Sequence, residues 1–338
     1  MSAQGQPLLQ VRDLQTQFGT RAGVARAVDG VSLDVHAGEI VGLVGESGSG
    51  KSVTGYSILG LIDAPGRIVG GSVKFDGQEL VGLPNHRLRT LRGRRVAMVF
   101  QDPMSTLNAV LKVSEQMRLA LLAHGRPSAA EMRQRCIDAL TKVGIPDPER
   151  RLDAYPHELS GGMRQRVAIA IAFLNHPALV ICDEPTTALD VSIQAQILVE
   201  MKTLVREAGV SLVWISHDLA TVSVLASRLL VMYAGRLIEQ GPTAEVLRRP
   251  RHPYTQGLID SLPSRAAPGR DLVQIPGATP SLTALPTGCA FKERCGYASR
   301  ACDVAPEQTF EPPRIWRCHH PLNIGAKSET AETAETAV

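Results

Sequence analysis

The sequence predicts an α/β fold with a parallel sheet as its core, an antiparallel β layer, a helical subdomain and a small loop-rich C-terminal module. Short apolar runs at residues 40–44, 96–100, 179–182 and 212–215 have the length and composition of strands buried on both faces. Helix-like segments separate these runs, as in sheets whose strands pair in parallel. A glycine-rich loop directly follows the first run.

The antiparallel layer is expected from residues 8–18 and 28–35, where apolar and polar side chains alternate as in half-buried strands. Residues 229–239 indicate a hairpin that turns at Ala234 and Gly235. The length of 338 residues suits two domains, and 44% hydrophobic residues are ample for a packed core.

The expected domain boundaries are the positions where the composition and periodicity of the sequence change. We expect a first domain at 1–250, with a largely helical insert at about 104–176 between the second and third core strands. Prolines recur after Pro250 and regular periodicity fades, which predicts a separate loop-rich module at 251–326. Residues 327–338 repeat Glu-Thr-Ala, and we expect them to form a disordered tail.

The glycine-rich loop at residues 45–52 reads Gly-Glu-Ser-Gly-Ser-Gly-Lys-Ser, a complete G-x-x-x-x-G-K-S motif between a strand and a helix. Its glycines let backbone N–H groups close around phosphate oxygens, and the helix points its positive end at the same place. Lys51 is expected to reach the β and γ phosphates, and Ser52 to bind Mg²⁺. The expected nucleotide-binding residues here are Gly45, Ser47, Gly48, Gly50, Lys51 and Ser52.

The third apolar run ends at two adjacent carboxylates, Asp183 and Glu184. Asp183, at the carboxyl end of a buried strand, is placed to hold the Mg²⁺ shell. Glu184 is placed to orient or deprotonate an attacking water. Such a strand end is common by itself, but together with the phosphate loop it predicts a hydrolysis site.

A second candidate anion site lies at Leu159-Ser-Gly-Gly-Met-Arg-Gln-Arg166, which runs into an apolar helix-like stretch. Ser160 is a good N-cap, and Gly161 and Gly162 expose backbone N–H groups at a helix N-terminus. Because the first loop already encloses one triphosphate, this site suggests a second nucleotide held by another chain. The segment resembles the signature sequence of ATP-binding-cassette (ABC) ATPases, and the order and spacing of motifs agree from about Leu8 to Gly241.

That resemblance implies a P-loop NTPase (RecA-like) core that binds ATP with Mg²⁺, and it gives roles to four further residues. Phe18 would stack on adenine. Gln101 would contact Mg²⁺ or the lytic water and link the site to the helical subdomain. Asp190, in Ala188-Leu-Asp190, would lie in a loop that crosses a dimer interface, and His217 would contact the γ-phosphate. Every expected catalytic position is filled, so the chain resembles an active ATPase.

Charge and hydropathy restrict the partners. The net charge of +3 is too small to argue for nucleic acid, and the basic run at 86–95 fits a solvated helix and turn. No apolar stretch approaches 18 residues, and there is no charged-then-apolar leader. We therefore expect a soluble, cytosolic protein whose transport path belongs to other subunits.

Four of the six cysteines, Cys289, Cys295, Cys302 and Cys318, lie in the loop-rich module, where a crosslink or metal would be structurally useful. Disulfides are not expected in a cytosolic ATPase. The spacing matches neither the usual zinc pattern nor bacterial ferredoxin, so it leaves zinc, an iron–sulfur cluster and unliganded thiols open. The other two, Cys136 and Cys182, fit small core residues.

The segment from His252 to Leu258 and the cysteine-containing block resemble the C-terminal extension of ATPases from dipeptide and oligopeptide importers, most closely the dipeptide group. Some members carry a four-iron (4Fe-4S) cluster on four C-terminal cysteines. The resemblance therefore implies that cluster on Cys289, Cys295, Cys302 and Cys318, with Zn²⁺ as the alternative. His319 and His320 adjoin the last thiol as alternative ligands.

The function implied is that of an ATP-hydrolysing subunit that energises dipeptide and oligopeptide uptake at the cytoplasmic face of a bacterial inner membrane. The implied partners are a second ABC ATPase subunit, preferably a related chain rather than a second copy, two transmembrane permeases and a periplasmic or lipid-anchored substrate-binding protein, without nucleic acid. Nickel complexes or glutathione stay open as cargo. A non-transport ABC ATPase and a redox- or metal-regulated ATPase are the alternatives from other classes.

Overall fold

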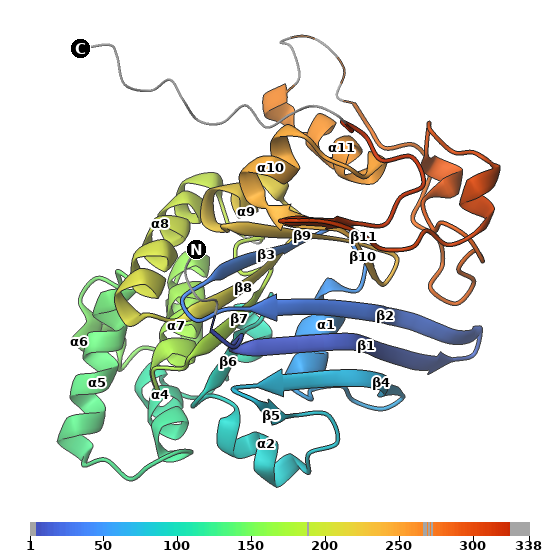
Figure 1. Ribbon diagram of the computed structural model, residues 1–338. Helices are drawn as coiled ribbons and strands as arrows, with labels where there is room; N and C mark the ends of the chain where they lie inside the picture. Colours follow the sequence, from blue (N-terminus) through green and yellow to red (C-terminus); the bar gives the residue numbers. More distant parts are fainter. Residues whose placement is uncertain (1–4, 188, 266–268, 270, 272, 325–338) are drawn as a thin grey trace.

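A computed structural model of the chain describes residues 5–187, 189–265, 269, 271 and 273–324. The predicted tail at 327–338 lies outside the described residues, as does Ala188. Among the described helices, none is both long and apolar enough to cross a membrane. Figure 1 shows the order of the elements along the chain.

The core is a sheet of eight strands in the order β11-β12-β10-β9-β3-β8-β7-β6. Five of these strands, from β9 to β6, pair in parallel and include the four predicted from the sequence, which confirms the expected α/β core. The strands are β3 (Ile40–Val44), β6 (Val96–Val99), β7 (Leu179–Asp183), β8 (Ser211–Ser216) and β9 (Arg228–Tyr233), followed by the antiparallel β10 (Arg236–Pro242).

The central strands are apolar throughout because both faces of the sheet are covered. Along β7, Leu179 and Ile181 belong to one hydrophobic cluster, whereas Val180 and Cys182 belong to the other. The burial of Cys182 agrees with its expected role as a small core residue. Alternate side chains therefore pack against different layers, and a continuous apolar run is the result.

One of these layers is a four-stranded antiparallel sheet in the order β2-β1-β4-β5. Helix α1 (Lys51–Ile58) contacts both this sheet and β7, and Ile58 packs in the cluster that the two sheets share. The predicted antiparallel layer is thus present. Its strands are β1 (Leu9–Thr20), β2 (Gly23–Val35), β4 (Gly66–Phe75) and β5 (Gln78–Glu79), and helix α2 (Asn85–Leu91) follows them.

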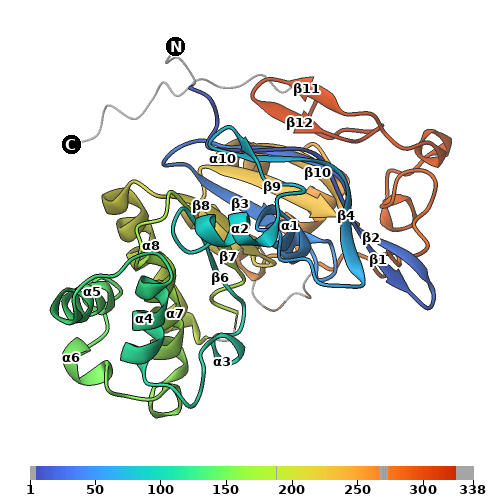
Figure 2. The ribbon, with the colours of Figure 1, turned by 90° about the horizontal axis from the view of Figure 1, so that it is seen from below.

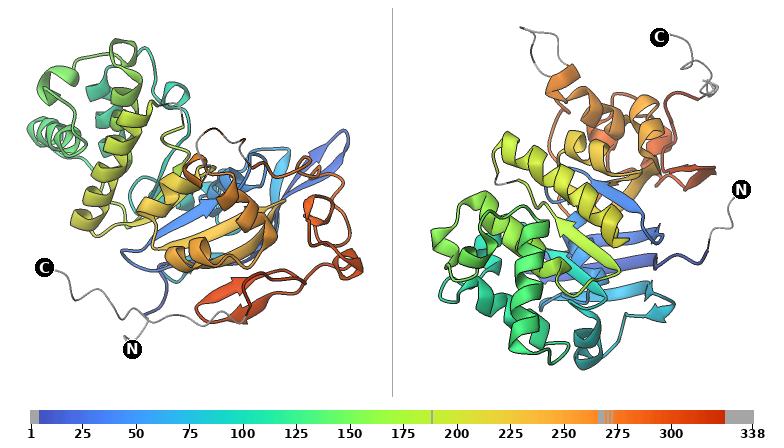
Figure 3. Two further views of the ribbon diagram at one scale, coloured as in Figure 1. Left: turned by 90° about the horizontal axis from the view of Figure 1, so that it is seen from above. Right: turned by 90° about the vertical axis from the view of Figure 1, so that its left-hand side faces the viewer.

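The helical subdomain lies at one end of the core sheet, on the opposite side from the β11–β12 hairpin (Figures 2 and 3). Its two longest helices start at serine caps; the hydroxyl of Ser128, for example, accepts the N–H of Glu131. The elements are α3 (Pro103–Thr106), α4 (Val113–Leu122), α5 (Ala129–Lys142), α6 (Pro148–Arg151), η1 (Pro156–Glu158) and α7 (Gly161–Phe173). Helices α8 (Val191–Ala208) and α9 (Leu219–Leu225) follow within the core domain.

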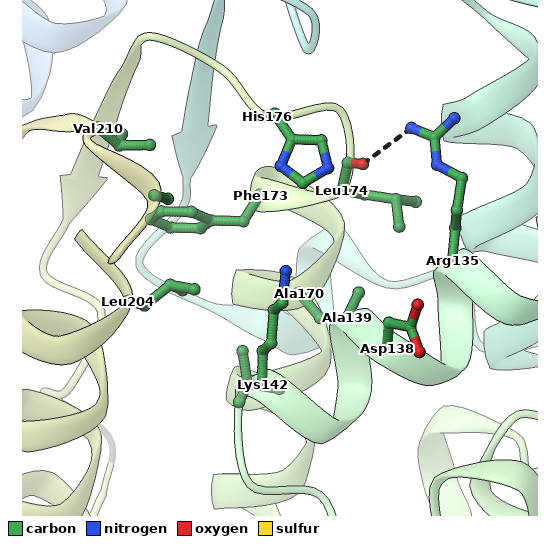
Figure 4. Close-up of a pocket in the computed structure, with 12 residues that line it drawn as sticks. Arg135, Asp138, Ala139, Lys142, Ala170, Phe173, Leu174, His176, Leu204 and Val210 are labelled. Atoms are coloured by element: carbon green, nitrogen blue, oxygen red, sulfur yellow. Dashed lines mark hydrogen bonds between the residues drawn. The ribbon is translucent and has the colours of Figure 1, made fainter. Parts of the chain in front are cut away.

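A cavity of about 90 Å³ lies where this subdomain meets α8, as the close-up in Figure 4 shows. Phe173, Leu204 and Val210 give it an apolar wall, and Arg135 donates from Nη2 to the carbonyl of Leu174 at 3.2 Å near its rim. Space for a few water molecules therefore interrupts the packing between subdomain and core.

The C-terminal module is loop-rich, and one of its strands joins the core sheet. Strand β12 extends the core sheet by pairing with β10, where Trp316 lies opposite Glu239. The carboxylate of Glu239 is fully buried, forms an ion pair with Arg314 and accepts the backbone N–H groups of Arg251 and His252, each at 2.8 Å. The elements are α10 (Thr243–Arg248), α11 (Pro253–Asp260), η2 (Pro263–Arg265), η3 (Lys292–Arg294), η4 (Arg300–Asp303), β11 (Thr309–Glu311) and β12 (Arg314–Trp316).

The expectation that the four C-terminal cysteines hold a 4Fe-4S cluster is wrong, and the Zn²⁺ alternative fails for the same reason. Among the described residues, no group of three or more His, Cys, Asp or Glu side chains could hold a metal ion. Burial raises the pKa of the Cys318 thiol to about 12 and also raises the pKa values of Cys289 and Cys295. The expected binding residues Cys289, Cys295, Cys302 and Cys318 are free thiols.

The neighbouring histidines are already engaged. His319 Nε2 lies 2.9 Å from the carbonyl oxygen of Val304, and His320 Nε2 lies 2.7 Å from the hydroxyl of Ser299. The prediction assumed that the module lacked a core of its own and needed a metal to replace it. Pairing of β12 with β10 and the packing of Phe291 against the core supply that stabilisation instead.

Candidate nucleotide site

The phosphate loop connects β3 to α1, and two of its glycines are required by close backbone contacts. A Cβ atom at Gly45 (φ +157°) would lie 2.1 Å from the carbonyl oxygen of Met232. A Cβ atom at Gly50 (φ +102°) would lie 2.1 Å from the carbonyl oxygen of Ala27. The loop is therefore held between β2 and the end of β9, in a shape that larger residues would break.

Lys51 opens α1 and is only 4% exposed. Its Nζ atom donates to the carbonyl oxygens of Gly45 at 2.8 Å and Glu46 at 2.9 Å. Burial lowers the pKa of Lys51, and the carboxylates of Glu184 and Asp183 oppose that shift. An ammonium group thus lies inside the loop, with carboxylates nearby, and loop oxygens accept its hydrogen bonds.

Asp183 ends β7 and is fully buried. Its Oδ1 atom accepts a hydrogen bond from the Ser52 hydroxyl at 2.8 Å, while Oδ2 has no hydrogen-bond partner among the described residues. Burial raises the pKa of Asp183. A buried carboxylate oxygen without a partner, next to a hydroxyl, is a donor set that fits Mg²⁺.

Glu184 is the meeting point of three side chains. Its Oε2 atom lies 3.0 Å from Nδ1 of His217 and accepts hydrogen bonds from Thr187 Oγ1 at 3.1 Å and Gln101 Nε2 at 3.4 Å. Gln101, Glu184 and His217 follow the carboxyl ends of β6, β7 and β8, which are neighbours in the sheet. The parallel topology therefore brings together residues that the sequence places far apart.

The backbone of Glu184 has a φ of +45°, which is uncommon for a residue with a side chain. Its N–H donates to the carbonyl of Ile215 at 2.9 Å and holds this conformation. The Glu184 side chain is only 12% exposed. The carboxylate is thus fixed at the edge of the phosphate loop by backbone as well as side-chain contacts.

Lys51, Ser52 and Glu184 are among the residues that line one open cavity of about 670 Å³, which is large enough for a nucleotide. Asp183 is not among the lining residues and reaches the site through its hydrogen bond with Ser52. The phosphate loop forms one wall, and Gln101, Glu184 and His217 form another. Leu258 of α11 and Leu282 also line it, and sequence reasoning missed both. No local pattern marks either leucine as a site residue, since they reach the cavity only through the docking of the C-terminal module.

The sequence comparisons agree with this site. The profile described as "ABC transporter" matches residues 28–187, which include the phosphate loop, Glu184 and the segment around Ser160. The oligopeptide transport ATP-binding protein OppD of Escherichia coli (strain K12) is 45% identical over 320 residues, covering 94% of this chain and 95% of OppD. The chain belongs to the ABC transporter ATP-binding proteins.

The C-terminal part of this ABC ATPase matches a second profile, "Oligopeptide/dipeptide transporter, C-terminal region", over residues 238–302. The dipeptide transport ATP-binding protein DppD of Haemophilus influenzae is 46% identical, covering 94% of this chain and 96% of DppD. None of the relatives' names cited here mentions an iron–sulfur cluster, in line with the correction above. The ABC ATPase therefore belongs to the oligopeptide and dipeptide transporter group.

Solved structures agree on the fold. A dimeric ATP-binding cassette in a post-hydrolysis state, bound to ADP and Pi, superimposes with a TM-score of 0.63 at 28% identity, covering 70% of this chain and 98% of that one. The cbiO1 protein of Clostridium perfringens, described as part of the ABC transporter complex cbiONQ, gives a TM-score of 0.62 at 28% identity, covering 72% of this chain and 92% of that one. The P-loop NTPase core, antiparallel layer and helical subdomain of the ABC ATPase are thus confirmed.

The signature residues of the ABC ATPase do not line its own nucleotide cavity. Ser160 caps α7 by accepting the N–H of Met163 at 3.3 Å, and Asp190 caps α8 by accepting the N–H of Ile193 at 3.0 Å. Gly162 lies against Ile193, because a Cβ atom added there would be 2.7 Å from that side chain. Ser160, Gly161, Gly162 and Asp190 thus form a second group, away from Lys51 and Glu184.

Phe18 also lies apart from the cavity. It sits on β1 opposite Ala25 of β2 and Gly66 of β4. Its ring packs over Gly66, where an added Cβ atom would lie 2.4 Å from the ring. The structure does not place Phe18 among the residues that line the cavity, so its stacking on adenine stays a prediction.

Proposed function

We propose that this chain is the ATP-hydrolysing subunit of a bacterial ABC importer that energises uptake of dipeptides and oligopeptides. The observation that carries the proposal is the convergence of Gln101, Glu184 and His217 beside the phosphate loop, in a chain similar to OppD and DppD over nearly its whole length. This is the arrangement expected of an active hydrolase, with a carboxylate held at the edge of an anion site.

In the proposed reaction, backbone N–H groups of residues 45–52 and the ammonium group of Lys51 bind the β and γ phosphates. Ser52, Asp183 and Gln101 would hold Mg²⁺, which neutralises developing charge on the phosphate oxygens. Glu184 orients or deprotonates a water whose oxygen attacks the γ-phosphorus as the bond to ADP breaks. His217, whose Nδ1 lies 3.0 Å from Oε2 of Glu184, would contact the γ-phosphate.

The second anion site is proposed to serve a partner. Ser160, Gly161 and Gly162 lie at the start of α7, apart from their own chain's cavity. They would complete the nucleotide site of a second, related ABC ATPase, with Asp190 near the interface between the two. The dimeric state of the superimposable cassette described above supports this arrangement. We favour a heterodimer because the resemblance of this chain to peptide-importer ATPases favours pairing with a related second ATPase.

The proposed contact with two transmembrane permeases is a groove between the core and the helical subdomain. A cavity of about 580 Å³ lies there, lined largely by apolar side chains that include Met98, Leu107, Leu119 and Ile171. Phe100, which also lines it, directly precedes Gln101. An apolar helix docked in the groove would therefore sense the nucleotide site. The chain would then lie at the cytoplasmic face of the inner membrane, and a periplasmic or lipid-anchored binding protein would deliver the peptide.

The experiment is reconstitution of the chain with its partner ATPase, two permeases and binding protein in lipid vesicles. We expect ATP hydrolysis and uptake to rise with di- and tripeptides, and the same complex carrying Glu184→Gln to show neither. Nickel complexes and glutathione test the alternative cargoes in the same vesicles. Stimulation by either of these without a response to peptides would reject the peptide proposal while leaving the ATPase assignment intact.

A further inference from the structure

A partly buried ion pair connects the phosphate loop to the C-terminal module. Glu46 is the second residue of the loop, and Arg294 ends η3 in the C-terminal module. Arg294 donates from Nη1 to Oε2 of Glu46 at 2.6 Å and from Nη2 to Oε1 at 2.9 Å. Two parallel N–H···O bonds of this kind fix both the distance and the orientation of the two groups.

Arg294 has little freedom to move. Its side chain is 5% exposed, and its Nε atom donates to the carbonyl of Pro276 at 2.7 Å. The guanidinium also lies 5.8 Å from the ring centroids of Tyr233 and Phe291. An arginine buried to this extent needs its carboxylate partner, so the contact with Glu46 is a requirement of the packing.

The C-terminal half of the chain holds Glu46 at three points. In addition to Arg294, the hydroxyl of Tyr254 in α11 accepts the backbone N–H of Glu46 at 2.8 Å. The hydroxyl of Thr279 donates to Oε2 of Glu46 at 3.1 Å. On its other side, the carbonyl of Glu46 accepts from Nζ of Lys51. Glu46 therefore links the C-terminal module to the lysine that meets the phosphates.

The charge of Glu46 gives this link a second consequence. Its side chain lines the same cavity as Lys51, and a bare carboxylate there would repel the phosphates of an incoming nucleotide. The guanidinium of Arg294 compensates that charge and holds the pKa of Glu46 below its ordinary value. In the full chain, a residue of the C-terminal module therefore balances the negative charge of Glu46 beside the cavity.

We propose that Arg294 is a positioning residue for ATP binding, which holds the phosphate loop through Glu46 and cancels the negative charge of Glu46 beside the phosphates. The C-terminal module therefore sets the affinity of this ATPase for nucleotide. When a nucleotide binds, a loop that is already ordered and charge-balanced costs less free energy of ordering and less electrostatic repulsion. The inference concerns nucleotide binding by the full chain, so it does not depend on the cargo of the importer.

The test measures MgATP affinity of the isolated full-length chain by titration calorimetry, together with steady-state hydrolysis in the assembled complex. Arg294→Met should weaken MgATP binding by about tenfold or more, because it leaves Glu46 charged and loose. KM for ATP should rise with it, whereas kcat at saturating ATP should stay within about twofold, since no reacting group has changed. The double variant Glu46→Gln with Arg294→Met should regain part of the lost affinity because the repulsive charge is gone.

Arg314→Met is the matched control. Arg314 is another buried arginine of the same module with a carboxylate partner, but that partner, Glu239, does not line the nucleotide cavity, whereas Glu46 does. We expect its loss to lower the unfolding temperature while MgATP affinity stays within about twofold. Wild-type affinity in Arg294→Met, or an equal loss in both variants, would overturn the proposal.

If Arg294→Met does not fold, the pair Arg294→Lys and Arg314→Lys gives the same comparison with the charges retained. Lysine keeps the positive charge but cannot form the two parallel hydrogen bonds to the carboxylate. Arg294→Lys should therefore weaken MgATP binding several-fold, and Arg314→Lys should not. Unchanged affinity in Arg294→Lys would then reject the positioning role. Failure of peptide uptake would reject the proposed function and leave this binding result standing, so the two can be separated.

Discussion

The Nδ1 atom of His217 lies 3.0 Å from Oε2 of Glu184, across the carboxyl ends of two neighbouring parallel strands. Gln101, from the end of the next strand, reaches the same oxygen atom at 3.4 Å. The carboxylate of Glu184 is therefore contacted by residues from the strands on either side of β7. Changes at this carboxylate should affect hydrolysis far more than nucleotide binding.

Replacing Glu184 with glutamine should abolish ATP turnover while MgATP affinity remains near that of the unaltered chain. The amide has the same shape but cannot accept a proton, and a positioned general base contributes about 10²- to 10⁴-fold. Phosphate release measures ATP turnover, and equilibrium binding measures MgATP affinity. Lys51→Ala is the contrasting variant, since it should weaken binding itself. Hydrolysis by Glu184→Gln within a few-fold of the original rate would remove Glu184 from this role.

Replacing Ser160 with arginine should impair hydrolysis in the assembled complex and leave MgATP binding to the isolated subunit nearly unchanged. The reason is that Ser160 caps α7 away from its own chain's cavity, so its loss should affect only a nucleotide held by the partner. Ser128→Arg, at the cap of α5, is the control for the cost of losing a helix cap elsewhere in the subdomain. Equal loss of binding by the isolated Ser160→Arg subunit would show that the signature segment acts within one chain.

Replacing Glu239 with alanine should destabilise the chain by about 3–5 kcal/mol, because it leaves Arg314 buried without a partner and frees two backbone N–H groups. Urea unfolding followed by circular dichroism measures this loss. Removing the exposed Glu115, which pairs with Arg118 on the surface of α4, should cost far less. Similar losses for the two substitutions would show that the buried pair does not anchor the C-terminal hairpin.

His252 should make the stability of the chain fall below pH 6.5. Burial lowers the pKa of this ring to about 3, whereas in the unfolded chain it would be near 6.5. Between these values the unfolded state binds a proton that the folded state does not, so acid favours unfolding. The contribution of His252 to the free energy of unfolding is fully present above pH 6.5 and should be about 2 kcal/mol smaller at pH 5.

Asparagine is the matched replacement at this position, because it also caps a helix N-terminus but does not titrate. His252 Nδ1 accepts the N–H of Tyr254 at 3.0 Å, and an asparagine side chain can accept the same bond. Urea unfolding between pH 5 and pH 7.5 should give a flatter profile for His252→Asn. Identical pH dependence in the two proteins would assign the acid sensitivity to other groups.

The core and the candidate site could be predicted from sequence where short motifs sit at strand ends. Gln101, Glu184 and His217 each follow a recognisable apolar strand, and parallel pairing then places them at one edge of the sheet. The contact between Glu46 and Arg294 could not be foreseen, because the partners are 248 residues apart and neither lies in a periodic pattern.

The cysteines show the opposite failure. Their spacing left zinc, a cluster and free thiols open, and a resemblance decided among these in favour of the cluster. Spacing carries no information on how deeply a thiol is buried, and burial raises the pKa of Cys318. The docking that stabilises the module, through Trp316 opposite Glu239, joins segments with no local signal of pairing.

Because β12 lies near the C-terminus, the core sheet cannot be completed until nearly the whole chain has been synthesised. As the chain emerges from the ribosome, β10 stays an open strand edge until Trp316 arrives opposite Glu239. A product that stops before residue 314 would carry that open edge together with a buried carboxylate that lacks Arg314. Unpaired strand edges recruit other chains, so such fragments are expected to aggregate or be degraded rather than to compete for the transporter.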